Sequence, residues 1–466
     1  MKREKLAEWA ARGCRWVVLA TIVASPTQWD ILRSHGGHLT LVEPLLLLAA
    51  LCWIVRVLAQ GDWWRISFPL PWQVVLFVLA ALLSIFMAER ECMSDALRET
   101  GKVLEYFVVG YILYDELLRL QPQRLRTVIY LALGAMVVIV LVALVQFFAC
   151  SDPIRGVTGT FKSRNVLGGW LAMMLPIVFG VALYTTKPLL RAGLWLLVFC
   201  GLAVDLSAAS LGAVLVVMLL IAATRGWRTF AIAALAATCW VGVVTNHIGW
   251  FKDPDTGARQ TSQQVLFRST ALYNFYGQPE RRYPQWQSAF EMMLDSPWLG
   301  VGIGNYQRRV EQYTGTKPLP TGPSEPDIQN LYLVIGSTMG LPALFGFLAL
   351  LLTPAFLAGA AASRHVHWRR GFVYGVAGGI AAFAITAIWH PLLVRGIGLH
   401  LVLLLVVARL LSEWSADPPA GDASLADKTA PHMDGPSGSS HRHHHHRHWR
   451  SPEHLSDKSF GNSDRQ

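Results

Sequence analysis

The sequence predicts an all-α polytopic membrane protein with about twelve transmembrane helices and one large loop outside the membrane. Hydrophobic residues make up 53% of the 466 residues and charged residues only 15%, whereas about a quarter of an ordinary soluble domain is charged. Apolar stretches of about 17 to 25 residues, long enough to cross a hydrocarbon core of about 30 Å, recur along the chain. They are interrupted by a single long polar segment, residues 251–328.

Each expected span is one such apolar stretch. In order, they are Cys14–Ala24, Leu39–Leu58, Phe68–Ala88, Val103–Leu117, Val128–Cys150, Leu167–Thr185, Leu190–Ser207, Leu211–Thr224, Phe230–Trp250, Leu331–Ala362, Gly371–Trp389 and Ile397–Leu411. Because Pro26 closes the first one early, that segment is either a short span or a re-entrant or tilted one. Leu331–Ala362 is longer than one crossing needs, which indicates an interfacial lead-in followed by a span.

Lysine and arginine are unevenly distributed between the short connections. They gather in the amino-terminal head and in every second connection, for example at residues 119–126 and 364–370, and are fewer in the opposing ones. Because short loops rich in these residues stay in the cytoplasm, both termini are predicted to be cytoplasmic and the long polar segment to face the periplasm. The head, Met1–Arg15, shows no cleavage pattern after its apolar stretch and is expected to be an uncleaved start.

Four regions are expected: amino-terminal transmembrane helices (1–250), the outward loop with an amphipathic helix (251–328), carboxy-terminal transmembrane helices (329–412) and a His-rich tail (413–466) whose composition predicts disorder. The net charge of +10 arises partly from the orientation signal, so it does not indicate nucleic-acid binding. The six cysteines have no metal-ligand spacing, and neither a metal site nor a cofactor is predicted. They are expected to be small buried hydrophobes; the alternative is a disulfide between Cys92 and Cys150.

The first outward cluster of cations precedes the span that begins at Leu167. Arg155, Lys162 and Arg164 supply donors beside Gly156 and Gly159, which allow a close approach of the backbone. The start of a helix also favours anions, so the segment is a candidate anion-binding site. The alternative interpretation is that the cations anchor the loop to lipid head groups.

The second cluster is the pair Arg281 and Arg282, followed by Trp286. Apolar residues recur three, four, seven and eight positions after Trp286, which predicts an amphipathic helix along the outer membrane interface; they are Ala289, Phe290, Met293 and Leu294. An arginine fork suits a phosphate or diphosphate. The alternative interpretation is a plain interfacial helix with snorkelling arginines.

The third segment alternates glycines, Gly300, Gly302 and Gly304, before Asn305. We expect a mobile turn here. The segment lacks the strand and helix context of a dinucleotide fingerprint, which excludes that interpretation.

These segments, in this order and topology, resemble the O-antigen ligase and polymerase family of bacterial surface-polysaccharide enzymes over roughly residues 150 to 345. The matching phrases are Arg155–Asn165, Arg282–Trp286, Pro297–Tyr306, Gln329–Leu333 and Gly340–Leu341.

The resemblance implies a membrane-embedded, metal-independent inverting glycosyltransferase with a fold similar to membrane glycosyltransferase class C, in the bacterial inner membrane. The implied donor is a glycan on undecaprenyl diphosphate. The acceptor would be lipid A core in a ligase, another lipid-linked glycan in a polymerase or a protein side chain in related oligosaccharyltransferases, with a product in O-antigen, lipopolysaccharide or exopolysaccharide biosynthesis.

The resemblance also suggests residue roles. Arg282 and Arg155 are expected to stabilise the leaving diphosphate, with Arg281 and Arg164 as further candidates. The remaining candidate substrate-binding residues are Lys162, Trp286, Asn305, Asn330 and Tyr332.

Two positions depart from the family pattern. Gln329 stands where the family has a histidine credited with activating the acceptor, and Leu211 stands where it has an arginine. Glu325 and Asp327 are therefore candidate carboxylate bases. Two alternatives remain open: a catalytically lapsed relative that binds lipid-linked glycan, and a transporter or flippase, although the latter should carry charges near mid-membrane.

Overall fold

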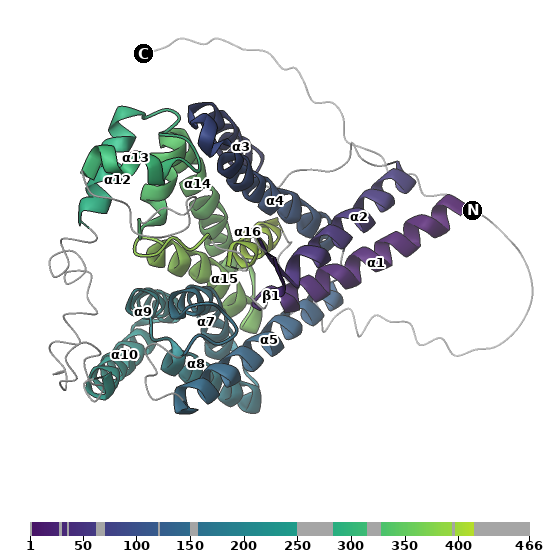
Figure 1. Cartoon of the computed structure of the whole chain (residues 1–466). Helices are drawn as coiled ribbons and strands as arrows, with labels where there is room; N and C mark the ends of the chain where they lie inside the picture. Colours follow the sequence, from purple (N-terminus) through teal and green to yellow (C-terminus); the bar gives the residue numbers. More distant parts are fainter. Residues whose placement is uncertain are drawn as a thin grey trace, which may run out of the picture. The chain divides into compact units, whose positions relative to one another are not determined.

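The computed structural model describes residues 2–27, 30–34, 37–61, 70–119, 122–149, 157–248, 283–314, 328–393 and 397–413. Its elements, in chain order (Figure 1), are α1 (Lys2–Ala24), β1 (Asp30–Ser34), β2 (Gly37–Thr40), α2 (Val42–Gln60), α3 (Pro71–Ser84), η2 (Ile85–Met87), η3 (Arg90–Cys92), α4 (Met93–Leu118), α5 (Pro122–Ala149), α7 (Arg164–Tyr184), α8 (Pro188–Val204), α9 (Ala208–Ala223), α10 (Trp227–Ile248), α12 (Tyr283–Asp295), α13 (Tyr306–Thr314), α14 (Leu331–Ala361), η5 (Ala362–Arg364), α15 (His367–Thr386) and α16 (Ile397–Glu413).

Every one of the twelve expected spans coincides with a helix. Within the described part of the chain, four segments are long and apolar enough to cross a membrane: Val42–Gln60, Thr127–Ala149, Arg164–Tyr184 and Leu331–Arg364. Three shorter apolar helices accompany them: Pro71–Met87, Pro188–Val204 and Ala208–Ala223. The architecture is that of a helical membrane protein, while the count of twelve spans and the periplasmic loop remain predictions.

One departure from the all-α prediction is a small antiparallel hairpin between α1 and α2. Strands β1 and β2 pair with Arg33 opposite His38 and Ser34 opposite Gly37. Two residues separate the strands in the sequence, which is the length of a tight hairpin connection. Leu39, expected to open the second span, therefore belongs to a strand, and the helix starts at Val42.

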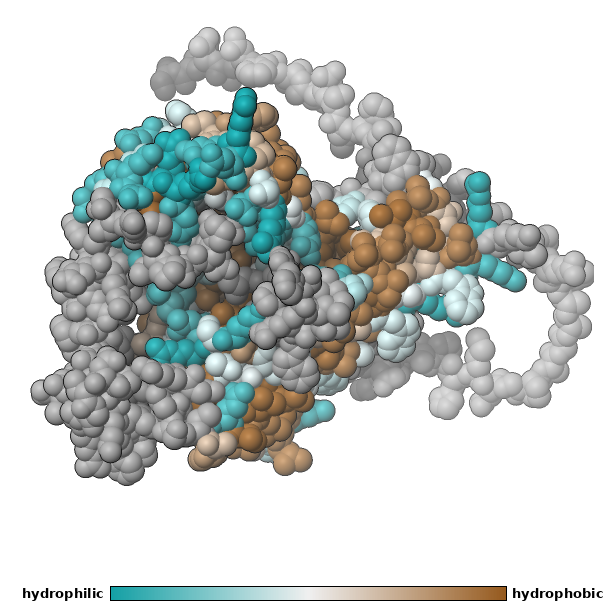
Figure 2. Space-filling view, viewed as in Figure 1, coloured by the Kyte–Doolittle hydropathy of each residue, from teal (hydrophilic) through white to brown (hydrophobic). Residues whose placement is uncertain are grey.

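Large apolar side chains are exposed along the outer helices. Leu58 on α2 and Phe148 on α5 are 73% and 82% exposed, and Figure 2 shows apolar surface along α1 and α2, with hydrophilic surface over α12 and α13. Such apolar surface is rare on soluble monomers and suits contact with lipid.

The centre of the molecule is the pair α7 and α15. Almost every residue of α7 is buried, and α15 presents glycines four residues apart at Gly371, Gly375 and Gly379. A Cβ at Gly375 would lie 2.5 Å from the Cα of Ile177, and one at Gly371 would lie 2.1 Å from the carbonyl oxygen of Gly180. Small residues at this spacing let two helix backbones approach closely, so these glycines hold α15 against α7.

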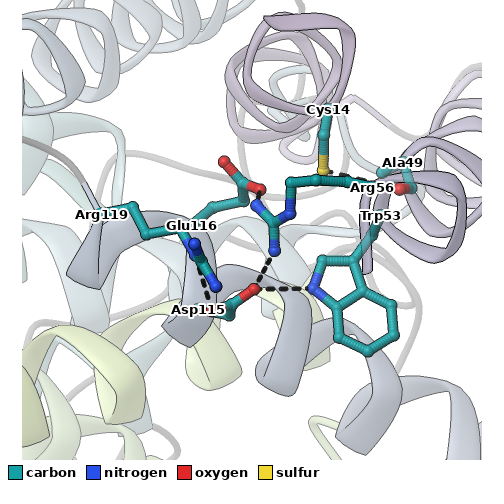
Figure 3. Close-up of polar contacts among 7 residues, drawn as sticks. All are labelled: Cys14, Ala49, Trp53, Arg56, Asp115, Glu116 and Arg119. Carbon is teal, nitrogen blue, oxygen red and sulfur yellow. Dashed lines mark hydrogen bonds and ion pairs between the residues drawn. The ribbon is translucent and has the colours of Figure 1, made fainter. Parts of the chain in front are cut away.

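A buried ionic cluster joins α2 to α4 (Figure 3). Arg56, 1% exposed, forms ion pairs with Asp115 and Glu116. Trp53 Nε1 donates to Asp115 Oδ2 at 2.9 Å, and Arg119 Nε donates to Asp115 Oδ1 at 3.0 Å. Arg56, Asp115 and Glu116 lie within two of the expected spans, Leu39–Leu58 and Val103–Leu117. Two cations and two carboxylates balance one another in this cluster, because each buried charge needs a partner.

Helix α14 is two helices joined at a kink. Gly340 has φ 83° and ψ 175° within it, a conformation that glycine adopts readily, and Pro342 follows at once. The overlong segment Leu331–Ala362 is thus divided near Gly340, and the interfacial lead-in followed by a span remains a prediction.

Candidate functional site

The segment before α7 is fixed at the C-terminal end of α5. Gln146 Oε1 accepts the backbone N–H groups of Thr158 and Gly159 at 3.0 and 2.7 Å, and Gln146 Nε2 donates to the Gly159 carbonyl at 2.9 Å. Ser163 caps α7 by accepting the N–H of Val166 at 3.4 Å. This bracing places the exposed Lys162 and the first helical residue, Arg164, at the N-terminus of α7, where the helix dipole also favours an anion.

The connection between α8 and α9 lies against the first turns of α7. Asp205, 2% exposed, accepts the N–H of Ser207 at 3.3 Å on Oδ1. Ser210 Oγ lies 2.7 Å from Asp205 Oδ2 and 2.6 Å from the carbonyl oxygen of Gly168. A Cβ at Gly168 would lie 2.7 Å from the Cβ of Ser207, so the glycine makes room for this connection.

Asp205 follows the last residue of α8, Val204, and lies near the end of the expected span Leu190–Ser207. Its buried carboxyl group accepts hydrogen bonds from Ser207 and Ser210.

The residues that follow α15 close the same region from another side. A Cβ added at Gly169 of α7 would lie 2.8 Å from Cδ2 of Leu392. The segment that contains Leu392 therefore packs closely on α7. His390, 8% exposed, has Nε2 3.5 Å from Ser207 Oγ.

The start of α14 is tied to the end of α15. Leu331 donates its N–H to the Ala387 carbonyl at 2.9 Å, and the Tyr332 hydroxyl donates to the Ala384 carbonyl at 2.7 Å. Asn330 caps α14 by accepting the N–H groups of Tyr332 and Leu333 at 2.9 and 3.1 Å. The exposed Gln329 directly precedes this cap, so the position that departs from the family pattern lies at the end of α14 that is fastened to α15.

The glycine segment is packed rather than mobile. Gly300, Gly302 and Gly304 all have positive φ. A Cβ added at Gly300 would lie 2.4 Å from the carbonyl carbon of Thr338. At Gly302 it would lie 2.8 Å from the backbone N of Ala88, and at Gly304 it would lie 2.9 Å from the backbone N of Ala96. The glycine segment was expected to be a mobile turn, but it is tightly packed between α14 on one side and Ala88 and the start of α4 on the other.

A second hydrophobic cluster lies beneath α12 and α13 and comprises Ala289, Met292, Val301, Tyr306, Val310 and Ile328, with Trp286 packed against it. Phe290 and Leu294 are 51% and 63% exposed. An amphipathic helix is present, and its buried face runs through Ala289, Met292 and Met293, because α12 packs on α14. Ala289 and Met293 were correctly expected on the apolar face, while Phe290 and Leu294 were not.

Ion pairs hold α13 to the connection between α3 and α4. Arg308 pairs with Glu89 and Glu91, and Arg309 Nε lies 3.1 Å from Glu89 Oε1. These arginines are occupied by carboxylates of the same chain and are poor candidates for binding a phosphate.

The candidate residues divide into two groups. Arg155, Arg281, Arg282, Glu325 and Asp327 lie outside the described residues. Among the others, Asn330 caps a helix and Asn305, fully buried, donates from Nδ2 to the Val301 carbonyl at 2.9 Å. The side chains of Asn305 and Asn330 thus hold the backbone around the site through hydrogen bonds.

Sequence reasoning missed the cluster formed by Asp205, Ser207, Ser210 and His390. The available signal was Asp205, an aspartate near the end of an apolar segment. His390 gave no clear signal, because a lone histidine near the end of a span is usually structural.

Residues 193–348, about a third of the chain, match a family model described as O-antigen ligase. The match runs from α8 into α14 and contains Asp205, the glycine segment and Gln329, while Arg164 and His390 lie outside it. No curated protein matches the chain. The family match confirms the resemblance to the O-antigen ligase and polymerase family. It supports, in general terms, an enzyme that transfers glycans and is embedded in a membrane.

Proposed function

With the O-antigen ligase family as premise, we propose that this protein transfers or polymerises a glycan carried on undecaprenyl diphosphate at the periplasmic face of the bacterial inner membrane. The observation that carries the proposal is the joining of three helix ends: the α8–α9 connection packs on the first turns of α7 and contacts the segment after α15, and the end of α15 is hydrogen-bonded to the start of α14. Both termini are on the cytoplasmic side, and the acceptor is lipid A core or another glycan.

The leaving group determines which residues matter most. As the glycosidic bond to the diphosphate breaks, negative charge grows on the departing oxygen, and fixed guanidinium groups stabilise it. Arg164 lies at the N-terminus of α7, and Arg281 and Arg282 immediately precede α12 in the sequence, which packs on α14. Together with Arg155, they form the proposed diphosphate site.

The reaction needs no metal ion when arginines supply this charge. The acceptor oxygen attacks the anomeric carbon from the side opposite the diphosphate, which inverts that centre. The polyprenyl chain stays in the bilayer while the glycan meets the outward loop, so the site lies beside membrane helices.

A catalytically lapsed relative is the second candidate, and a specific observation favours it. Leu211 packs its side chain against the hydrophobic core, and Gln329 carries no proton that titrates near neutral pH. Such a protein would bind lipid-linked glycan without transferring it. The transporter or flippase alternative would use buried charge, but the cluster around Arg56 is paired within itself.

The test measures glycan chain length on lipid carrier and on lipid A core in cells lacking the protein, complemented with wild type or with Arg282→Ala. Short unextended repeats in the deletion strain indicate a polymerase, and long unattached polymer indicates a ligase. Arg228→Ala, which removes an exposed arginine at the start of α10, is the matched control and should complement fully. Full complementation by Arg282→Ala would overturn the leaving-group assignment, and glycan patterns identical with and without the protein would overturn the function.

A further inference from the structure

A hydrogen-bonded group of side chains lies at the meeting of the outward helix ends. His390 Nε2 is 3.5 Å from Ser207 Oγ, Ser207 donates its N–H to Asp205 Oδ1 at 3.3 Å, and Ser210 Oγ is 2.7 Å from Asp205 Oδ2. His390 retains 8% exposure, while Asp205 and Ser210 have 2% and 0%. The histidine is thus the outermost member, and the carboxyl group lies behind it.

Ser210 holds the carboxyl group of Asp205 against α7. Its hydroxyl lies 2.7 Å from Asp205 Oδ2, to which it donates, and 2.6 Å from the carbonyl oxygen of Gly168 on α7. Because Ser207 also donates its N–H to Asp205 Oδ1, both carboxyl oxygens are hydrogen-bonded and the α8–α9 connection is fixed beside α7.

His390 lies close to the expected acceptor position. The hydrogen bond from Leu331 to Ala387 joins the chain two residues after Gln329 to the chain three residues before His390.

We infer that His390 is the general base of this protein, acting in place of the histidine that Gln329 replaces, and that Asp205 and Ser207 position it. This inference rests on the proposed glycan transfer. The acceptor hydroxyl gives its proton to the imidazole of His390, the acceptor oxygen bonds to the anomeric carbon, and the carbon–oxygen bond to the diphosphate breaks with its electron pair remaining on the diphosphate. The imidazolium then releases the proton to water.

The test uses full-length protein in proteoliposomes with a lipid-diphosphate-linked glycan donor and a glycan acceptor. General-base catalysis typically contributes 10²- to 10⁴-fold, so His390→Ala should lower kcat by about 100-fold or more with little change in KM. Added imidazole should restore part of the lost rate. The double variant His390→Ala, Gln329→His should recover activity as well, because it returns a histidine to the family position.

The matched control is His365→Gln, which alters a buried histidine in the connection between α14 and α15 and should leave kcat unchanged. Ser207→Ala should reduce kcat less than His390→Ala does and should not respond to imidazole, as expected for a positioning residue. Equal kcat for wild type and His390→Ala would overturn the inference, as would a loss that neither imidazole nor Gln329→His relieves. Absence of transfer by the wild type would instead overturn the proposed function.

Discussion

The backbone N–H of Val301 donates a hydrogen bond to the carbonyl oxygen of Ser337 at 2.8 Å. This bond fastens the glycine segment to α14 just before the kink at Gly340, and a second bond, from Leu341 N–H to the Pro297 carbonyl at 2.7 Å, fastens it just after. The glycine segment is therefore attached to α14, the helix whose first residues follow Gln329, on both sides of the kink.

Gly340 should tolerate no side chain. A Cβ there would lie 2.4 Å from the carbonyl oxygen of Trp298, at a φ of 83°, so Gly340→Ala should lower the free energy of unfolding by about 2 to 4 kcal/mol through strain and overpacking. Unfolding of the purified protein in detergent measures this. Gly359→Ala on the same helix, where a Cβ meets nothing within 4 Å, should be neutral or stabilise by up to about 1 kcal/mol; equal losses in both variants would contradict the packing argument.

Arg56→Met should destabilise the protein strongly, because it leaves the Asp115 and Glu116 carboxylates buried beside one another. Removing one partner of a buried ion pair costs about 3 to 5 kcal/mol. Arg12→Ala serves as control, since Arg12 and Glu8 are 67% and 68% exposed and such pairs contribute about 1 kcal/mol or less. Denaturant titration of both variants gives the comparison, and a small effect at Arg56 would show that the cluster does not stabilise the fold.

The orientation can be tested at the two ends of α7. Lys162 and Lys187 are exposed and flank this helix. In a background with the native cysteines replaced, Lys162→Cys should react with a membrane-impermeant maleimide in intact spheroplasts, and Lys187→Cys should react only after permeabilisation. The reverse pattern would invert the predicted topology.

The helices were predictable from sequence, and much of the site was not. Uninterrupted apolar length is a local signal, so all twelve expected segments coincide with helices, and the break in Leu331–Ala362 was visible in its excess length. The hairpin at β1 and β2 was missed because short strands carry a weak periodic signal. The buried face of α12 was predicted correctly at Ala289 and Met293 but not at Phe290 and Leu294, which satisfy a helical period and yet are exposed.

The sequence by itself determined a helical membrane protein, an orientation prediction and a family resemblance, because hydropathy, charge distribution and short phrases are properties of contiguous residues. Only the tertiary structure decided that Ser210 meets Gly168 across 42 residues and that Ser207 meets His390 across 183. Those contacts depend on which helix ends lie side by side, and that follows from the close packing of α7 and α15 through glycines rather than from any local pattern.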